Sequence, residues 1–571
     1  MAMKRDLVLL TLLGLLAYLP GLASLPVIDR DEARYAQSVV QMVETGDYID
    51  IRLQDEPRYK KPVGAYWAQV AAIFATGQAD DIRAGERPIW AQRLPSVLGA
   101  LIAVWATYLT GQALFGRREA FVGAALLAVS VSLVFEAHQA KTDALLVGAC
   151  AVALYGLVKG RAWPLWLAIG AGVLVKGPVI VGVMGLAVAS LSLIFRIPGL
   201  VSRCAAAGSR AVESEDSNRP VVIHSSSRPR VRPGDTALLR PHLRPLPILV
   251  TLAFVLPWFI AISVVSDGAF YSEALGRDFG GKLGFAQESH GGPPGYYLLT
   301  ALLMWWPGVL ALPVAAVWSW RERQTPAVAL LLCWLVPMWL VLEFVPTKLP
   351  HYTLPLYPAL ALLCGAAWVR TAEGDERKWR KLGGVLFAPG AFAVAFLAAS
   401  GALATSEGAM FVARLALFGV LLFTLGAALR QYVRYASTGP VFIAGGLAAA
   451  SVFTLGNSAF RAFTGDISTA LAQEAGDARI VTQVYREPSL AYLAGTGTRL
   501  DLCRIEPGDF IVVVEVTLVP TCASSGLYMT GINYADGSPV TLNAFRTDAC
   551  EPETLTRWAR EQADPTLDCG E

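Results

Sequence analysis

Long apolar runs recur through most of this chain of 571 residues and constrain its fold more than any other feature. A run of about 20 apolar residues can cross a bilayer as a helix, because a helix satisfies its backbone hydrogen bonds internally. Hydrophobic residues make up 54% of the chain and the mean hydropathy is +0.48, which excludes an ordinary soluble enzyme. The sequence therefore predicts a polytopic membrane protein with about thirteen spans. They occupy residues 6–26, 90–113, 119–138, 143–160, 162–176, 178–196, 245–265, 296–316, 327–345, 353–369, 384–402, 409–429 and 438–458.

Changes in composition divide the chain into a membrane part and a polar tail. Residues 1–458 are expected to form a mainly α, transmembrane helix bundle, and residues 459–571 a small α/β domain outside the cytoplasm. Within the membrane part, residues 27–89 form a long first outer loop. Residues 197–244 are rich in Arg, Ser and Pro, so we predict a mobile cytoplasmic insert without a catalytic role.

Positive charges predict which side of the membrane each connection faces. Lys4 and Arg5 precede the first run, and the connections that hold Arg117, residues 196–244 and Arg430 are also basic. Under the positive-inside rule these segments lie in the cytoplasm and the alternate connections lie outside. The prediction is a multi-pass membrane protein whose C-terminal domain lies outside the cytoplasm.

Two stretches of the first outer loop predict short juxtamembrane helices. The first stretch repeats apolar residues at helical spacing and ends at Gly46, and we expect it to lie on the membrane surface. The second runs from residue 63 to residue 74 and is too short for a span. The apolar positions of the first stretch are Ala36, Val39, Val40 and Val43.

The polar tail predicts a small sheet stabilised by disulfides. Residues 478–481 and 509–516 resemble strands, and the second is apolar on both faces, which is typical of a central strand. A helix is expected to begin near residue 468. The four tail cysteines predict two disulfides with three possible pairings, and they are Cys503, Cys522, Cys550 and Cys569. The remaining cysteines, expected to be core thiols, are Cys150, Cys204, Cys333 and Cys364.

An acidic cluster follows the first apolar run directly, in the segment Asp29-Arg30-Asp31-Glu32-Ala33-Arg34-Tyr35. Charge that faces lipid is costly, so such a cluster belongs at the mouth of a water-filled cavity. Helix capping accounts for Asp29 and Glu32 but leaves Asp31 and Arg34 unexplained. A carboxylate here can act as a general base on an acceptor hydroxyl or bind a metal, whereas Arg34 suits a phosphate.

Cationic clusters recur at the same predicted face of the membrane. A single lysine at a bilayer edge often extends toward water and anionic head groups without any further role. Several clusters on one face instead favour a common site for an anionic, lipid-borne substrate. The clusters are Lys60-Lys61-Pro62, Lys141-Thr142-Asp143, Lys176-Gly177-Pro178 and Lys348-Leu349-Pro350-His351-Tyr352.

His290 lies in an outer loop rich in Gly and Pro, directly before a predicted span. A single histidine in such a loop is usually an ordinary surface residue. A metal-binding role would need partners, and Glu288 is the nearest candidate in the sequence.

The motifs also occur in a familiar order along the chain. The ordered set is Asp31-Glu32-x-Arg34-Tyr35-Ala36, Lys61-Pro62 followed by Tyr66-Trp67, Thr142-Asp143, Lys176-Gly177-Pro178, His290-x-x-Pro293 with Tyr296-Tyr297, and Lys348-Leu349-Pro350-x-Tyr352. This set resembles the clan of polytopic glycosyltransferases (superfamily C) that contains the lipid A aminoarabinose transferases and the protein O-mannosyltransferases. The resemblance covers most of residues 1–460, and the tail resembles the aminoarabinose branch.

The resemblance implies an inverting transfer of a sugar from a polyprenyl phosphate to an acceptor on the extracytoplasmic face. It implies that Asp31 is the catalytic acid-base residue, that Glu32 and Arg34 support it, and that Asp143 is a second functional aspartate. Cations would stabilise the departing phosphate while a carboxylate deprotonates the attacking oxygen.

The same resemblance indicates which residues bind the donor. Lys61 and Tyr352 would hold the lipid phosphate. Tyr35, Lys176 and Lys348 are further candidates for substrate binding, because they bring aromatic and cationic groups to the same predicted face.

One position departs from the pattern of the aminoarabinose transferases. In those proteins the residue before the Lys-Pro motif is a glutamate that shares a metal with the histidine matched here by His290. This chain has Lys60 there, and a protonated lysine cannot ligate a metal. These residues therefore do not favour a divalent metal as cofactor, and they leave the identity of the sugar and the acceptor open.

The sequence predicts a membrane glycosyltransferase with a polyprenyl-phosphate-linked sugar as donor and a lipid A-like lipid, another envelope component or a protein as acceptor. Membrane lipids are the other expected partners, and no nucleic acid is expected. Two alternatives remain, a flippase or transporter of lipid-linked sugars and a non-catalytic membrane scaffold. Transporters usually keep polar groups near the bilayer midplane and contain repeats, whereas these charges gather at one interface.

Overall fold

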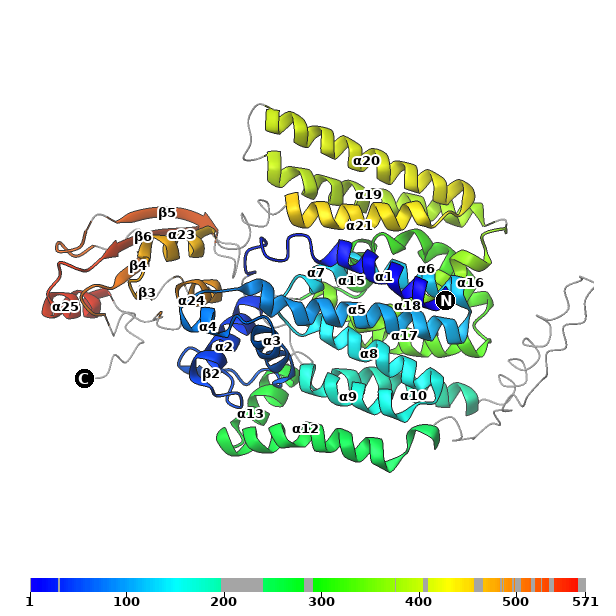
Figure 1. Ribbon diagram of the computed structural model, residues 1–571, viewed down its shortest axis with the longest axis horizontal. Helices are drawn as coiled ribbons and strands as arrows, with labels where there is room; N and C mark the ends of the chain where they lie inside the picture. Colours follow the sequence, from blue (N-terminus) through cyan, green and yellow to red (C-terminus); the bar gives the residue numbers. More distant parts are fainter. Residues whose placement is uncertain are drawn as a thin grey trace, which may run out of the picture.

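A computed structural model of the protein describes residues 2–28, 31–196, 240–281, 291–374, 376–403, 409–455 and 466–562, the last range with gaps at 483–484, 486, 496–497, 499–504, 515–518, 525 and 533–538. A bundle of long helices forms most of the molecule (Figure 1). The first outer loop and the C-terminal sheet lie at one end of this bundle, and the N-terminus lies at the other (Figure 1).

Membrane-length helices account for much of the bundle. In the part of the chain that the structure describes, six helical segments are long and apolar enough to cross a membrane, or up to eight if each of two bent pairs counts as one span. The six are α5 (Ile89–Leu114), α12 (Pro245–Val265), α17 (Pro326–Phe344), the segment Pro350–Arg370 formed by η5 (Pro350–Leu356) and α18 (Tyr357–Arg370), the first part of α19 (Arg377–Leu403) and the later part of α20 (Ala409–Tyr435). The other bundle helices are α1 (Ala2–Tyr18), α8 (Asp143–Lys159), α9 (Ala162–Lys176), α10 (Val179–Arg196) and α21 (Gly439–Leu455).

Each apolar run predicted from the sequence contains a helix, so the prediction of a polytopic helical fold is confirmed. The predicted number of spans is not, because several of these helices, such as α9 and α10, are shorter than the thickness of a bilayer requires. The predicted insert at residues 197–244 lies almost wholly outside the described residues, which resume at Arg240 with the short helix η2 (Arg240–His242).

Two bent helix pairs replace straight spans. Helix α6 (Arg117–Ala128) meets α7 (Val131–Ala137) at 58°, and α15 (Tyr296–Met304) meets the segment of η4 (Gly308–Ala311) and α16 (Leu312–Arg321) at 118°. The second break contains Pro307, which lacks the N–H needed to continue a helix. The breaks contact each other, since the Val131 N–H donates to the Trp306 carbonyl oxygen at 2.9 Å.

Two glycines allow α5 and α8 to pack backbone against backbone. A Cβ at Gly99 would lie 2.7 Å from the carbonyl oxygen of Ala144, and a Cβ at Gly148 would lie 2.7 Å from that of Gly99. Any larger residue would push the two helices apart, because the backbone cannot move aside as a side chain can. This close approach fixes the beginning of α8, where Asp143 lies.

The first outer loop folds as α2 (Asp31–Thr45), the short hairpin β1 (Arg52–Leu53) and β2 (Glu56–Pro57), α3 (Gly64–Ala75) and α4 (Ala79–Arg83). Both predicted helices are therefore present. The placement of α2 on the membrane surface is wrong, because its apolar residues are fully buried among protein side chains of α3 and of the C-terminal helix α24 (Pro488–Ala494). Helical periodicity reveals an apolar face but not whether lipid or protein covers it.

The C-terminal region contains a four-stranded mixed sheet with the order β3-β4-β6-β5. Strands β3 (Ile480–Thr482) and β4 (Phe510–Val514) are parallel, while β6 (Pro539–Arg546) is antiparallel to both β4 and β5 (Leu527–Ile532). The strand predicted as central is β4, which lies between β3 and β6. Helices α23 (Asp466–Ala475) and α25 (Pro552–Gln562) complete the region.

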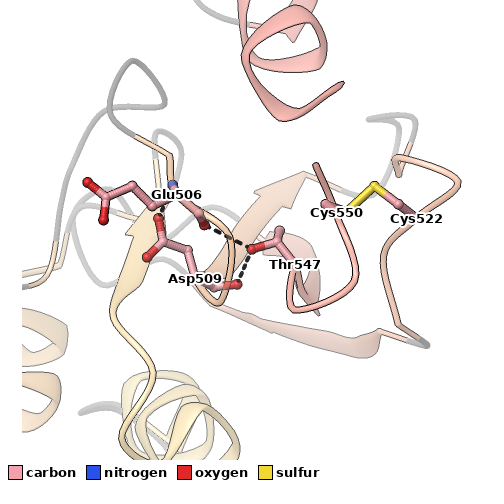
Figure 2. The surroundings of a disulfide bond; sticks show 5 residues. All are labelled: Glu506, Asp509, Cys522, Thr547 and Cys550. Carbon is pink, nitrogen blue, oxygen red and sulfur yellow. Dashed lines mark hydrogen bonds between the residues drawn. A yellow bond between two sulfur atoms is a disulfide. The ribbon is translucent and has the colours of Figure 1, made fainter. Parts of the chain in front are cut away.

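A disulfide between Cys522 and Cys550 closes a segment with a sequence separation of 28 residues (Figure 2). Nearby, the Thr547 hydroxyl donates to the carbonyl oxygens of Glu506 and Asp509 at 3.1 and 3.0 Å (Figure 2). One of the two expected disulfides is therefore present, and Cys503 and Cys569 lie outside the described residues, as does Cys204. The prediction of buried thiols is confirmed for Cys150, Cys333 and Cys364.

The C-terminal region docks on the first outer loop. The Arg87 Nε donates to the carbonyl oxygen of Tyr492 at 2.9 Å, and the Gln54 Nε2 donates to that of Thr498 at 2.5 Å. Tyr492 is buried in the same apolar cluster as α2 and α3. The tail therefore supports the outer loop through both hydrogen bonds and apolar contacts.

The tight α5–α8 contact yields a stability prediction. Gly99→Ala should lower the free energy of unfolding by about 1–3 kcal/mol, because the added methyl overlaps the α8 backbone. Thermal unfolding of the purified protein in detergent measures this effect. Gly185→Ala in α10 is the matched control, since a Cβ there meets nothing within 4 Å. Equal melting temperatures for the two variants would contradict the proposed contact.

Candidate active site

A cavity of about 660 Å³ lies where the first outer loop meets the bundle. Its walls come from segments far apart in the chain, namely α2, the residues before α3, the junctions of α8 and α9 with their neighbours, α12, α17 and η5. Charged and aromatic groups gather in one part of the lining, and aliphatic side chains form the rest. The site residues predicted from the sequence that line this cavity are Asp31, Tyr35, Lys61, Asp143, Lys176 and Tyr352.

Asp31 begins α2 and lines the cavity, where solvent reaches its side chain although protein surrounds it on most sides. Burial would raise the pKa of this carboxyl, but the positive charges of Lys141, Arg58 and Arg34 outweigh burial and lower the pKa to about 2. Asp31 is therefore ionised at neutral pH and carries a negative charge within the cavity.

Glu32, the neighbour of Asp31, points away from the cavity into the protein. Its carboxylate and the Arg93 guanidinium are both fully buried and pair at 2.8 Å. The remaining polar groups of this pair bond to the backbone, because a buried charge is stable only when it is paired and hydrogen-bonded. These backbone partners are the N–H groups of Ile28 and Ala140, which donate to Glu32, and the carbonyls of Leu22, Leu25 and Pro26, which accept from Arg93.

One cation and two aromatic rings pack against one another in a stack near Asp31. The Arg58 guanidinium lies 5.3 Å from the ring centroid of Tyr35, and the rings of Tyr35 and Tyr66 are 4.8 Å apart. Arg58 and Tyr35 both line the cavity. The stack holds the positive charge of Arg58 near Asp31. Among the described residues, the two side chains do not form a direct ion pair.

Lys60 and Lys61 enter the cavity from the segment before α3. Lys61 forms an ion pair with Asp278 of the π-helix η3 (Ser272–Gly280), which follows the single-turn helix α13 (Ala269–Tyr271). Gly64 brings this segment close to α9, since a Cβ there would lie 2.7 Å from the Leu174 carbonyl carbon. The glycine thereby places the two lysines beside the end of α9.

Asp143 and Lys176 form the opposite side of the charged region. The Lys176 Nζ lies 2.6 Å from Asp143 Oδ1 and 5.5 Å from the ring centroid of Tyr352. Gly177, with φ of +65°, turns the chain directly after Lys176 and lets α10 begin. The pairing prevents Asp143 and Lys176 from acting as isolated charges.

Behind Asp143 lies a buried layer of further ionisable groups. His351 lies between two carboxylates, with its Nδ1 3.7 Å from Glu136 Oε1 and its Nε2 3.8 Å from Asp143 Oδ1. Glu136 in turn pairs with Lys141 at 3.1 Å. Acidic and basic side chains therefore alternate along this wall, so that each charge has an opposite charge nearby.

Two other predicted site residues lie outside the cavity lining, and a third is not among the described residues. Lys348 is buried outside the cavity lining, and its ammonium donates to the carbonyls of Leu342, Glu343 and Val345 at the end of α17, as a helix C-cap does. Arg34 is half-buried and acts on Asp31 through its charge. His290 lies outside the described residues.

The apolar part of the cavity faces the outside of the bundle. Val181 of α10, Leu275 of η3 and Val341 of α17 line it, and they are 51%, 50% and 41% exposed. Large exposed aliphatic side chains on the outside of a bundle of apolar helices are typical of a surface that lipid covers. The cavity therefore joins a charged pocket to an opening that suits a hydrocarbon chain.

The sequence motifs missed several residues of the site. Arg58 belongs to no motif and reaches the cavity only through the hairpin that precedes it, while Asp278 comes from η3, more than 200 residues after Lys61. Glu136 lies within an apolar run, where a buried carboxylate is itself a signal of function or pairing. His351 belongs to the motif that begins at Lys348, but only its position between two carboxylates distinguishes it.

One residue, Lys60, does not fit the divalent metal that the family resemblance implies, and the other expected ligand, His290, lies outside the described residues. Lys60 occupies the position of the expected acidic ligand, and an ammonium group repels a cation. Among the described residues, no group of three or more His, Cys, Asp and Glu side chains could hold a metal ion. We therefore derive no chemical step through a metal.

This chain is similar to several known membrane proteins. Residues 81–202 match the family described as dolichyl-phosphate-mannose-protein mannosyltransferase. The undecaprenyl phosphate-α-4-amino-4-deoxy-L-arabinose arabinosyl transferase 2 of Proteus mirabilis is 26% identical over 402 residues, which are 67% of this chain and 63% of that protein. The corresponding transferase of Yersinia pestis is 25% identical over 66% of this chain and 62% of that protein. The matches thus span less than two thirds of the length of these relatives.

The fold has solved counterparts. The crystal structure of ArnT from Cupriavidus metallidurans bound to undecaprenyl phosphate has a TM-score of 0.68 and 18% sequence identity, and the match covers 94% of this chain and 97% of that one. The apo structure of the same protein has a TM-score of 0.66 and covers 98% of this chain. At this identity the likeness establishes the shared fold.

The comparisons confirm the resemblance predicted from the motifs. The chain is a multi-pass integral membrane protein that shares the fold of ArnT from Cupriavidus metallidurans. Its sequence is similar to the aminoarabinose transferases named above.

The buried pair beneath Asp31 yields a second stability prediction. Arg93→Met should lower the free energy of unfolding by roughly 3–5 kcal/mol, because it leaves the Glu32 carboxylate buried without its counter-ion. Arg83→Met is the control, since the Arg83–Asp80 pair is largely exposed. Thermal unfolding in detergent compares the two. If the Arg93→Met and Arg83→Met variants have the same melting temperature, Glu32 and Arg93 do not anchor the loop.

Proposed function

We propose that this protein is a membrane glycosyltransferase that moves a sugar from a polyprenyl-phosphate donor to an acceptor, with Asp31 as the catalytic base. One observation carries the proposal: a single cavity combines an ionised carboxylate and several cations with an apolar opening toward the lipid-facing surface. An amphiphilic substrate with an anionic head and a long hydrocarbon chain matches both parts.

The donor binds with its phosphate among the cations and its prenyl chain along the apolar wall. Lys61 and Lys176 approach the phosphate from two sides, and Tyr352 lies beside Lys176. Their carboxylate partners, Asp278 and Asp143, hold the ammonium groups in place before the donor arrives. The prenyl chain leaves between α10 and α17, where exposed aliphatic residues line the cavity.

Transfer requires a base on one side of the sugar and a stabilised leaving group on the other. The acceptor oxygen attacks the anomeric carbon, the bond from that carbon to the phosphate oxygen breaks, and its electron pair remains on the phosphate. Asp31 takes the proton of the acceptor. The cations stabilise the second negative charge that the phosphate gains as it leaves.

The low pKa of Asp31 in the free protein keeps the base ionised but makes it weak. The bound phosphate adds a negative charge beside the cations that lower this pKa. Asp31 therefore becomes more basic when the donor is present, since a nearby negative charge raises the pKa of a carboxyl. Donor binding thus prepares the base for the acceptor.

Similarity to the arabinosyl transferases supports an undecaprenyl phosphate carrier and a pentose such as 4-amino-4-deoxyarabinose. A lipid A-like acceptor agrees with the same resemblance, and the match of residues 81–202 to a protein mannosyltransferase family favours a protein acceptor as the second candidate. The first outer loop, which lines part of the cavity, and the docked C-terminal region lie at the same end of the bundle (Figure 1). We assign this end to the periplasmic side of a bacterial inner membrane.

Asp31→Asn tests the proposal. The variant should reduce transfer by at least a hundredfold and leave thermal stability unchanged, because the amide keeps the shape but cannot accept a proton. Purified protein is reconstituted with undecaprenyl-phosphate sugars and with lipid A or peptide acceptors, and the release of undecaprenyl phosphate is measured. Asp80→Asn, on a side chain that is 93% exposed in the same loop, is the control.

Two outcomes of this assay would overturn the assignment. Full turnover by Asp31→Asn would exclude Asp31 as the base. Movement of the sugar lipid across the liposome bilayer without any release of undecaprenyl phosphate would identify a flippase instead.

The pH dependence of transfer gives a separate prediction. Because Asp31 has a pKa of about 2, the wild-type enzyme should show no loss of kcat/KM from this group at mildly acidic pH. Lys141→Gln removes the largest charge that lowers this pKa, so the pKa of Asp31 rises and activity should fall at higher pH than in the wild type. Lys159→Gln, at the exposed far end of α8, should leave the profile unchanged. Identical profiles for all three proteins would contradict the role of Lys141.

A further inference from the structure

Among the described residues, the charges that line the cavity do not balance. Four cationic side chains and three carboxylates from this part of the chain line it, and they leave one positive charge in excess: Arg58, Lys60, Lys61 and Lys176 against Asp31, Asp143 and Asp278. Two lysines have a carboxylate partner, Lys61 with Asp278 and Lys176 with Asp143. Arg58 lies against an aromatic ring and acts on the nearby Asp31.

Lys60 carries the charge that remains. Its side chain is half-buried and lines the cavity, and it makes no hydrogen bond or ion pair with any residue that the structure describes. It directly precedes Lys61 in the chain, so two ammonium groups enter the cavity from adjacent positions. A partly buried ammonium beside other cations is unfavourable unless an anion compensates it.

We propose that Lys60 binds the phosphate of the polyprenyl donor and supplies the charge that completes the donor site, so that this site needs no divalent metal. The inference rests on the function proposed above. Lys60 stands where the family resemblance implies an acidic metal ligand, and a lysine there replaces the charge of a metal ion with its own. The ammonium group of Lys60 would thus attract the donor phosphate without a metal ion.

The charge on the substrate changes during transfer in a way that Lys60 can use. The sugar phosphodiester carries one negative charge, and the departing phosphomonoester gains a second when the bond from the anomeric carbon to oxygen breaks. The proton of the acceptor moves to Asp31, so the total charge of the site does not change. A cation without a carboxylate partner responds fully to this new charge, whereas Lys61 and Lys176 are already partly neutralised.

Binding of undecaprenyl monophosphate measures the inference directly. The full-length protein in detergent is titrated with undecaprenyl monophosphate and with uncharged undecaprenol, at low salt and in the presence of EDTA. Lys60→Met should weaken binding of the phosphate by about tenfold to a hundredfold, the usual value of one charge-assisted hydrogen bond. Binding of undecaprenol should not change, because the prenyl wall is untouched.

Two further variants separate a binding role from a structural one. Lys60→Arg keeps the charge and should retain most of the affinity for the phosphate. Lys159→Met removes an exposed lysine of α8 far from the cavity lining and should bind as the wild type does. The melting temperatures of all variants are compared, so that a loss of affinity is interpreted only for folded protein.

The outcomes distinguish the two proposals. If the wild-type protein binds undecaprenyl monophosphate no better than undecaprenol, the proposed donor class itself is wrong. If the wild type prefers the phosphate and Lys60→Met keeps that preference, only the role of Lys60 is wrong. If EDTA abolishes the preference of the wild type and added divalent cations restore it, a metal recognises the phosphate and the inference is overturned.

Discussion

The buried ion pair between Glu32 and Arg93 is the interaction on which the site depends. It joins the first turn of α2 to α5, to the chain that leaves α1 and to the segment before α8. Both side chains are fully buried, so removal of either partner would leave a buried charge without its counter-ion and destabilise the fold. Asp31 is the residue next to Glu32 and faces the opposite way, into the cavity. The anchor therefore fixes the position of the carboxylate on which the proposed chemistry relies.

Electrostatic pairing explains how so many charges coexist at one end of a membrane bundle. Each buried carboxylate of the cavity wall lies near a cation, as Asp143 does near Lys176 and Glu136 near Lys141. Such pairing keeps the side chains ordered and charged, so a substrate meets a preorganised site. Arg58 stacks on Tyr35 and does not pair with a carboxylate. Among the other described charges of the lining, the departures from pairing are Asp31, where a base must stay accessible, and Lys60, which an anion must reach. These two residues lie where an anionic donor and its acceptor would meet.

Residue type and motif order predicted which residues line the cavity better than they predicted what each residue does there. Lys61, Lys176, Asp143 and Tyr352 all line the cavity, as the motifs indicated. Lys348 belongs to an equally suggestive motif, yet it caps α17, because a lysine beside the end of a helix can reach three free carbonyls. The anchoring role of Glu32 depends on Arg93, 61 residues later in the chain, and no local pattern reveals such a partner.

The sequence by itself determined that this protein is a polytopic helical membrane protein, that acids and bases gather at one of its faces, and which clan it resembles. The length of the apolar runs, the helical repeat of apolar residues and the order of the motifs can all be read along the chain, without knowledge of which distant segments are in contact. Only the tertiary structure decided that protein covers the apolar face of α2, that Arg58 and Asp278 join the cavity, and that no carboxylate of the described residues pairs with Lys60. Those facts depend on which distant segments pack together, because a charge is compensated through space and not along the chain.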